Sequence, residues 1–129
     1  MTQPDPGFLT GRSILLVEDE LLVALLVEDL LKEAGADILG PAPRVAAALQ
    51  LIADADRIDL ALLDVNLAGA WVWPVAEELR RRSVPYLLLT GYGAGIVDAE
   101  HMDAGVLTKP VSERDLLAAV AGVLSPGRS

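Results

Sequence analysis

Short runs of consecutive apolar residues alternate along the chain with longer stretches in which apolar residues recur every three or four positions. Five runs are short enough to be strands, and they lie at residues 14–17, 36–39, 60–63, 86–89 and 106–107. The run at 36–39 is the weakest of them. Runs that are apolar on both faces are typical of a parallel sheet covered by helices on both sides. The pattern therefore predicts five strands in such a sheet.

The stretches between these runs have the spacing of amphipathic helices. Apolar residues recur on one face in four places, at residues 23–34, 45–52, 72–79 and 116–123. Gly35 is placed to end the first helix, and Pro74 falls in the first turn of the third helix. Ser112, with Asp115 three residues later, resembles the N-terminal cap of the last helix. Residues 91–104 contain three glycines and allow only a short helix, so we expect mobility there.

Strands that alternate with helices predict an α/β fold, a doubly wound five-stranded parallel sheet with helices on both faces. We expect one domain over residues 12–124. Residues 1–11 contain two prolines and two glycines, and we expect them to form a flexible N-terminal tail. Residues 125–129 are expected to form a C-terminal tail. No internal repeat and no linker to a second domain is found.

The composition narrows the classes of partner. The 129 residues carry a formal net charge of −9, so we expect neither nucleic acid nor an anionic membrane to be bound directly. The sequence has no cysteine, which excludes disulfides, thiolate metal sites and thiol catalysis. The N-terminus lacks the features of a signal peptide, and no apolar run is long enough to span a membrane. We therefore expect a cytoplasmic protein.

Polar side chains stand where the predicted strands end. Glu18 and Asp19 follow the first strand, Asp64 the third, Thr90 the fourth and Lys109 the fifth. The carboxyl ends of parallel strands meet at one edge of the sheet, so these side chains are expected to converge. Gathered carboxylates repel one another unless a cation is present, and an all-oxygen site suits Mg²⁺.

This arrangement of acids, hydroxyl and amine suits phosphoryl transfer. An ionised Asp64 is an oxygen nucleophile that can attack phosphorus and form an acyl phosphate. The reaction requires positioning and neutralisation of charge on the phosphoryl oxygens. Mg²⁺, the Lys109 ammonium and the Thr90 hydroxyl would supply that neutralisation.

In these residues the sequence resembles a response-regulator receiver domain of two-component signalling, over about residues 12–124. The resemblance implies a flavodoxin-like sheet with strand order 2-1-3-4-5. It implies that Asp64 accepts a phosphoryl group from a histidine kinase or phosphotransfer protein, that Thr90 is the switch hydroxyl and that Lys109 contacts the phosphoryl group. It further implies a cis Lys109-Pro110 peptide and a Mg²⁺ site formed by Glu18, Asp19, Asp64 and the backbone carbonyl of Asn66.

Two features qualify this resemblance. Receivers with an aromatic toggle carry Tyr or Phe three residues before the lysine, and here that residue is Val106, so a rotating ring cannot report phosphorylation. The stretch Thr90-Gly91-Tyr92 resembles the Phe-Ala-Thr-Gly-Tyr type of mostly single-domain bacterial receivers, in which the fourth helix is often short or mobile. We hypothesise that Tyr92, or backbone rearrangement after Gly91, reports phosphorylation instead.

Some residues have two interpretations from sequence. Glu20 is better explained as a negative charge that favours the start of the following helix than as part of a site. Trp71 and Trp73 either pack against the third helix or contribute to a partner surface. Leu22 and Leu25 widen the apolar face of the first helix, as additional core or as a contact patch.

The leading functional hypothesis is a single-domain response regulator, with no enzymatic activity beyond self-phosphotransfer and slow self-dephosphorylation. Without an attached output domain, it would act on a downstream protein target or serve as a phosphate sink or relay. One alternative is a haloacid-dehalogenase-like phosphatase, but such enzymes need a general acid where this chain has Asn66. Another is a pseudo-receiver that is never phosphorylated.

Overall fold

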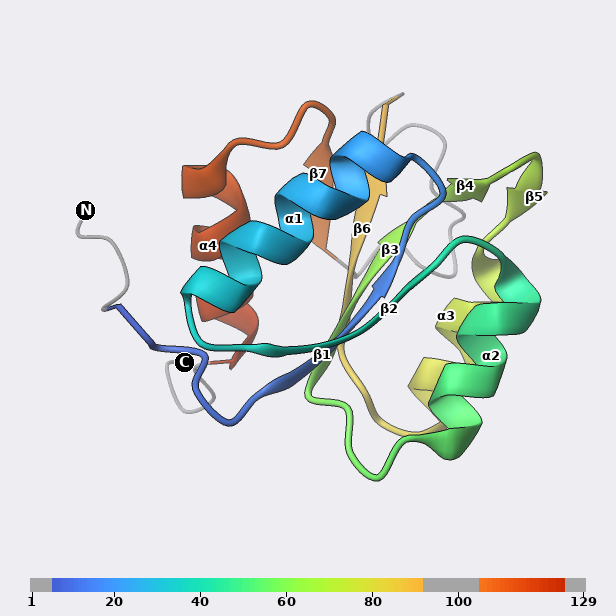
Figure 1. The fold of residues 1–129 in the computed structure, drawn as a ribbon. Helices are drawn as coiled ribbons and strands as arrows, with labels where there is room; N and C mark the ends of the chain where they lie inside the picture. Colours follow the sequence, from blue (N-terminus) through green and yellow to red (C-terminus); the bar gives the residue numbers. More distant parts are fainter. Residues whose placement is uncertain (1–5, 92–104, 125–129) are drawn as a thin grey trace.

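The computed structural model describes residues 6–91 and 105–124, which form a sheet with helices on both sides (Figure 1). The main strands are β1 (Ser13–Val17), β2 (Asp37–Ala42), β3 (Leu60–Asp64), β6 (Tyr86–Thr90) and β7 (Gly105–Thr108). The helices are α1 (Leu21–Glu33), α2 (Val45–Asp54), α3 (Trp73–Arg81) and α4 (Glu113–Leu124). A small hairpin consists of β4 (Asn66–Leu67) and β5 (Ala70–Trp71).

The five main strands are all parallel and lie in the order β2-β1-β3-β6-β7. With β6 and β7 as the fourth and fifth main strands, this is the predicted order 2-1-3-4-5, and the predicted fold class is confirmed. The register pairs Asp64 with Leu89 and Thr90 with Thr108. The polar residues at the ends of neighbouring strands are therefore brought to one edge of the sheet.

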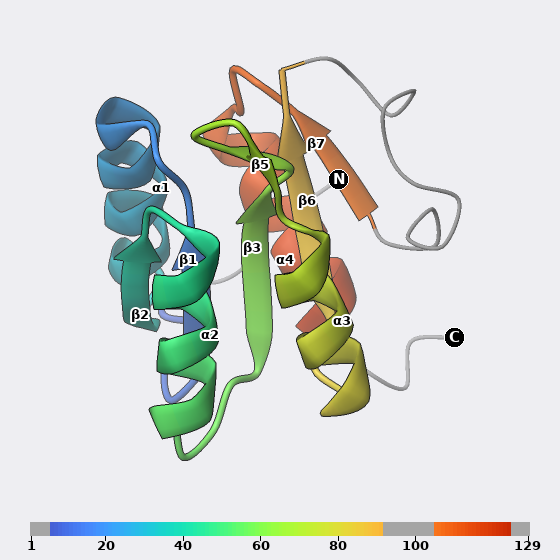
Figure 2. The ribbon, with the colours of Figure 1, turned by 90° about the vertical axis from the view of Figure 1, so that its right-hand side faces the viewer.

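The apolar residues of the strands face alternate sides of the sheet. Leu15, Ala61 and Leu63 belong to a core cluster shared with α2 and α3, whereas Leu16 and Leu62 belong to a second cluster shared with α1 and α4. Figure 2 shows α2 and α3 in front of the sheet and α4 behind it. Both faces of the central strand β3 are thus covered, which is why the run at residues 60–63 has no polar alternation.

The second strand is longer than its apolar run indicates. It continues through Gly40 and Pro41 to Ala42, where the sequence pattern favours a turn. Gly40 has a φ of +102°, and a Cβ at this position would lie 2.6 Å from the Leu16 carbonyl oxygen. The pairing with β1 is irregular here, since the register shifts between Leu15 and Val17. A glycine allows the two backbones to approach closely enough for the strand to continue.

The prediction of a flexible tail up to residue 11 is wrong for residues 6–11. Leu9 is fully buried in the cluster that contains α1 and α4, and its backbone N–H donates to the Ala34 carbonyl at 2.8 Å. Phe8 packs against the same cluster. These residues lack a periodic pattern, but two apolar side chains are enough to attach the segment to the end of α1. Residues 1–5 and 125–129, predicted as tails, lie outside the described residues.

Several local predictions are confirmed. Gly35 has a φ of +105° directly after α1, Pro74 lies in the first turn of α3, and the Asp115 N–H donates to Ser112 Oγ at 3.0 Å. The Lys109-Pro110 peptide is cis. Among the described residues, no helix is both long and apolar enough to cross a membrane. The predictions about Tyr92 and mobility at residues 92–104 concern residues outside the described ranges.

Candidate functional site

A pocket of about 460 Å³ lies at the carboxyl edge of the sheet. Its lining comes from the segments that follow β1, β3, β6 and β7, which are the segments in which the sequence places its polar residues. Figure 2 shows the β4–β5 hairpin beyond the carboxyl end of β3, next to this edge. The lining residues are Asp19, Glu20, Asp64, Asn66, Ala68, Gly69, Gly91 and Lys109.

Asp64 is the last residue of β3 and is 5% exposed. Its Oδ1 accepts a hydrogen bond from the Asn66 backbone N–H at 3.2 Å, and its Oδ2 accepts one from Lys109 Nζ at 3.1 Å. The strand delivers the carboxylate to the pocket because Leu63 and Val65 on either side are buried in the core. The side chain is therefore held between a backbone donor and an ammonium group.

Glu18 lies beneath the pocket and is 2% exposed. Lys109 Nζ donates to Glu18 Oε2 at 3.2 Å, and Glu18 Oε1 lies at ion-pair distance from the same nitrogen, 3.0 Å, without accepting a hydrogen bond. One acceptor of a buried carboxylate is thus left without a hydrogen bond, which is costly in a protein interior. A cation bound directly to Glu18 would satisfy it.

The charges in this cluster are incompletely balanced. Burial, and after it the nearby Glu18 carboxylate, raise the pKa of Asp64 to about 8, and Lys109 only partly opposes them. A protonated Asp64 is a poor nucleophile. A second cation would favour the ionised form, and oxygen donors with an unsatisfied carboxylate fit a hard divalent ion such as Mg²⁺. The donor set of the pocket therefore fits the predicted metal.

Asp19 lines the pocket and is also hydrogen-bonded to the hairpin that follows β3. Its Oδ2 accepts a hydrogen bond from the Ala68 N–H at 3.0 Å. Ala68 has a φ of +51°, an unusual conformation for a residue with a Cβ, and Gly69 follows with a φ of +90°. The Gly69 N–H donates to Asn66 Oδ1 at 3.0 Å. Asp19 and Asn66 thus hold a tight turn beside Asp64 that sequence reasoning did not predict.

The interpretation of Glu20 as only a helix-start charge is wrong. Glu20 is the N-cap residue of α1, but its side chain makes no capping hydrogen bond. Its Oε1 instead lies 2.7 Å from Lys109 Nζ. Carboxylate oxygens of Glu18, Glu20 and Asp64 lie within 4.8 Å of one another. The third acid of this cluster is therefore Glu20. The only signal in the sequence was its place directly after Glu18 and Asp19.

Thr90 ends the fourth main strand and Val106 lies in the fifth, as the sequence predicts. Thr90 is the last residue of β6, is 1% exposed, and its carbonyl accepts a hydrogen bond from the Lys109 N–H at 2.8 Å. Val106 is partly buried and packs against the cluster under α2 and α3. The threonine is therefore connected through the backbone to the residue whose ammonium contacts Asp64.

Exposed apolar side chains lie beside the pocket. The exposed large hydrophobic side chains among the described residues are Leu21, Leu22, Leu25, Leu26 and Trp71. The four leucines belong to the first two turns of α1, which begins directly after Glu20, and Trp71 belongs to the hairpin beside Asp64. Trp71 stacks on Trp73 with the ring centroids 6.5 Å apart. Leu22 and Leu25 are thus surface residues and not additional core, and the contact patch stays a prediction.

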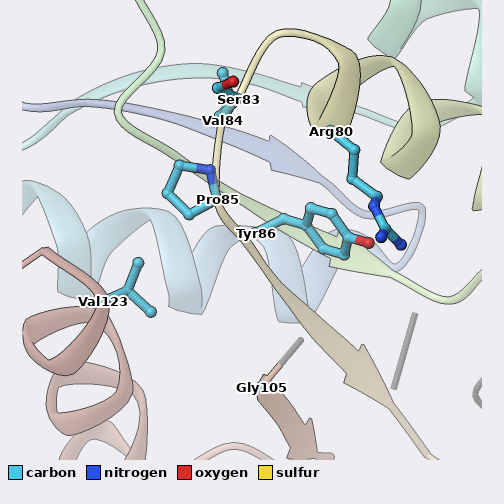
Figure 3. Close-up of a pocket in the computed structure, with 7 residues that line it drawn as sticks. All are labelled: Arg80, Ser83, Val84, Pro85, Tyr86, Gly105 and Val123. Atoms are coloured by element: carbon cyan, nitrogen blue, oxygen red, sulfur yellow. The ribbon is translucent and has the colours of Figure 1, made fainter. Parts of the chain in front are cut away.

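A second pocket of about 450 Å³ lies at the opposite end of the sheet, near the start of β6 and β7 (Figure 3). Figure 3 shows the Tyr86 side chain extending toward that of Arg80, with Val123 of α4 on the far side of Pro85. Open α/β sheets bind their ligands at the carboxyl ends of the strands, and this pocket is at the amino ends. We therefore take the acidic pocket as the candidate site.

The chain is similar to known proteins in sequence and in fold. A family model described as response regulator receiver domain matches residues 14–121. The transcriptional regulatory protein PdtaR of Mycobacterium tuberculosis is 31% identical over 126 residues, which are 93% of this chain and 61% of PdtaR. This chain thus spans less than two thirds of the length of that relative.

Two solved structures have a similar fold. The receiver domain of Erythrobacter litoralis PhyR, determined by NMR, has a TM-score of 0.81 and 26% identity, with 93% of this chain and 95% of that chain covered. SdrG from Pseudomonas melonis Fr1, in its BeF3-activated conformation, has a TM-score of 0.75 and 40% identity, with 87% and 95% covered.

Proposed function

The chain belongs to the response regulator receiver family, and we propose on this premise that Asp64 accepts a phosphoryl group from a phosphohistidine and thereby switches a protein-binding surface. Receiver domains are regulatory and interact with histidine kinases and downstream targets. The single observation that carries the proposal is the Asp64 carboxylate, buried at a strand end and hydrogen-bonded to the Lys109 ammonium. The lack of cysteine fits the reducing cytoplasm, where we place the reaction.

In the proposed reaction an oxygen of the ionised Asp64 carboxylate attacks phosphorus. The new P–O bond forms as the P–N bond to the donor imidazole breaks, and the imidazole nitrogen keeps the electron pair. Lys109 Nζ, already 3.1 Å from Oδ2, can offset negative charge on the transferred group. The Asn66 N–H at Oδ1 holds the carboxylate in position.

Receiver domains bind Mg²⁺ at an acidic pocket. We propose that Glu18, Asp19, Asp64 and the Asn66 backbone carbonyl hold it here. The unsatisfied Glu18 Oε1 and the presence of Asp19 and Asn66 in the pocket lining support this set. When bound, the ion would keep Asp64 ionised and neutralise phosphoryl oxygens.

We assign the switch to Thr90. It ends the strand next to Asp64, and its carbonyl is hydrogen-bonded to the Lys109 backbone, so displacement of either residue is passed to β7 and the start of α4. A ring toggle is excluded because Val106 is not aromatic. SdrG is described in a BeF3-activated conformation, which supports an activated conformation for this chain as well.

A protein that donates phosphate must cover the pocket mouth. The exposed leucines of α1 and Trp71 lie beside it and offer apolar contact area, while the exposed Glu20 and Asp29 provide negative charge. We therefore propose that a histidine kinase or phosphotransfer protein docks here through apolar residues bordered by basic ones.

The test is incubation with Mg²⁺ and acetyl phosphate, followed by measurement of intact mass. Wild type should gain the mass of one phosphoryl group, and Asp64→Asn should gain none. Asp56→Asn, a matched change at an exposed aspartate on the α2–β3 connection, should behave as wild type. Equal labelling of Asp64→Asn would refute the assignment. No labelling of wild type would favour a pseudo-receiver, and continuous hydrolysis of a phosphomonoester would favour the phosphatase.

A further inference from the structure

The Lys109 ammonium has no hydrogen-bond donor to spare. A protonated lysine has three N–H donors. Here Nζ donates to Glu18 Oε2 at 3.2 Å, to Asp64 Oδ2 at 3.1 Å and to Glu20 Oε1 at 2.7 Å. The lysine side chain is 13% exposed, so few water molecules can reach it. To contact a phosphoryl oxygen, Lys109 must therefore give up one of three carboxylates.

Of the three contacts, the one to Glu20 is the shortest and also the easiest to break. Glu18 and Asp64 are buried and lose hydrogen bonds that water cannot replace, whereas the Glu20 side chain is 60% exposed. Water can solvate a carboxylate at that exposure, and exposed ion pairs contribute little net stability. The donor released for the phosphoryl group is thus the one that Glu20 holds.

The orientation of Glu20 is not explained by the helix it begins. Its carbonyl accepts the first helical hydrogen bond, from the Ala24 N–H at 2.9 Å, but its side chain caps no helical N–H. Instead its own N–H donates to Glu18 Oε2 at 3.0 Å and its carboxylate extends to Lys109. Backbone and side chain of Glu20 are therefore both directed to the acidic cluster.

We propose that Glu20 is a positioning residue that slows phosphorylation of Asp64, because its carboxylate occupies the Lys109 donor that the phosphoryl group needs. This inference rests on the proposed function. Glu20 also adds negative charge within 4.8 Å of the Asp64 and Glu18 oxygens, where an anionic phosphodonor must enter. The occupied Lys109 donor and the added negative charge both slow phosphorylation of Asp64.

The test is the rate of phosphorylation of the Glu20→Gln variant by acetyl phosphate at a fixed Mg²⁺ concentration. Removing one partly screened charge near the reacting carboxylate, and freeing one lysine donor, is expected to raise the rate about threefold to tenfold. High salt should reduce the part of the rate increase that comes from the removed charge. The part that comes from the released Lys109 donor should remain. Phosphoramidate, which carries less negative charge than acetyl phosphate, should show a smaller increase.

Glu33→Gln is the matched control, since it makes the same change at an exposed position at the far end of α1. It should phosphorylate at the wild-type rate. Mg²⁺ affinity of metal-free Glu20→Gln, measured by calorimetry, should fall by less than about tenfold, because the lost charge attracts the ion from a largely exposed position without being its ligand. Its thermal unfolding midpoint should stay close to that of wild type.

The outcomes separate this inference from the proposed function. If wild type is not phosphorylated, the proposed function fails and this inference fails with it. If wild type is phosphorylated on Asp64 but Glu20→Gln reacts at the same rate or more slowly, only the inference is overturned. A tenfold or greater loss of Mg²⁺ affinity would also overturn it, because Glu20 would then be a metal ligand.

Discussion

Replacing Asp64 with asparagine is expected to stabilise the metal-free protein, although it removes the proposed phosphoacceptor. The Asp64 side chain is 7% exposed. Burial, followed by the neighbouring Glu18, raises its pKa from 3.8 to about 8, against the opposing effect of Lys109. An amide of nearly the same shape carries no charge into this environment. The variant therefore removes an electrostatic cost of folding.

The size of the effect follows from the pKa. Below about pH 4 the carboxyl is protonated in both states, and at higher pH only the folded state keeps the proton. Between about pH 4 and pH 8, the free energy of unfolding of wild type should fall by up to about 1.4 kcal/mol per pH unit, about 4 kcal/mol by pH 7. Asparagine avoids this loss but gives up the hydrogen bond between the protonated carboxyl and Glu18, so we expect a net gain of about 1–3 kcal/mol at pH 7.

Urea denaturation of both proteins between about pH 5 and pH 8, in EDTA, measures this difference. The gain should increase with pH and shrink when Mg²⁺ is added, because the ion stabilises only the carboxylate of wild type. Asp56→Asn, at an exposed position, should show neither trend. A variant that is less stable than wild type at pH 7 in EDTA, or a gain that does not depend on pH, would refute the reasoning.

Three further predictions test the docking surface, the N-terminal segment and a helix cap. Leu22→Asp should slow phosphotransfer from a kinase at least about tenfold and leave the acetyl phosphate rate unchanged; equal losses with both donors would contradict a docking role. Leu9→Ala should lower the free energy of unfolding in urea by about 2–4 kcal/mol, and a loss below about 0.5 kcal/mol would exclude residues 6–11 from the core. Ser112→Ala should cost about 1 kcal/mol in the same assay, because the Asp115 N–H loses its acceptor; unchanged stability would count against the cap.

The sequence predicted most of the fold because the signals for it are local. Uniform apolar runs identified the strands of the central sheet, and three- and four-residue spacing identified the helices. The errors occurred where a residue acts through a distant partner. Gly40 permits β2 to continue only because the Leu16 backbone lies against it, and Leu9 is buried only because the end of α1 lies over it. Neither contact leaves a pattern in the chain.

The sequence alone determined which kinds of side chain stand at the strand ends: three acids after the first strand, one after the third, a hydroxyl after the fourth and an amine after the fifth. The tertiary structure decided how they are paired. Asp19 is hydrogen-bonded to the hairpin at Ala68, while Glu20 joins Glu18 and Asp64 around Lys109. The physical reason is that strand and helix periodicity depends on neighbours in sequence, whereas the partner of a charge depends on distances between loops, which exist only after the sheet has formed.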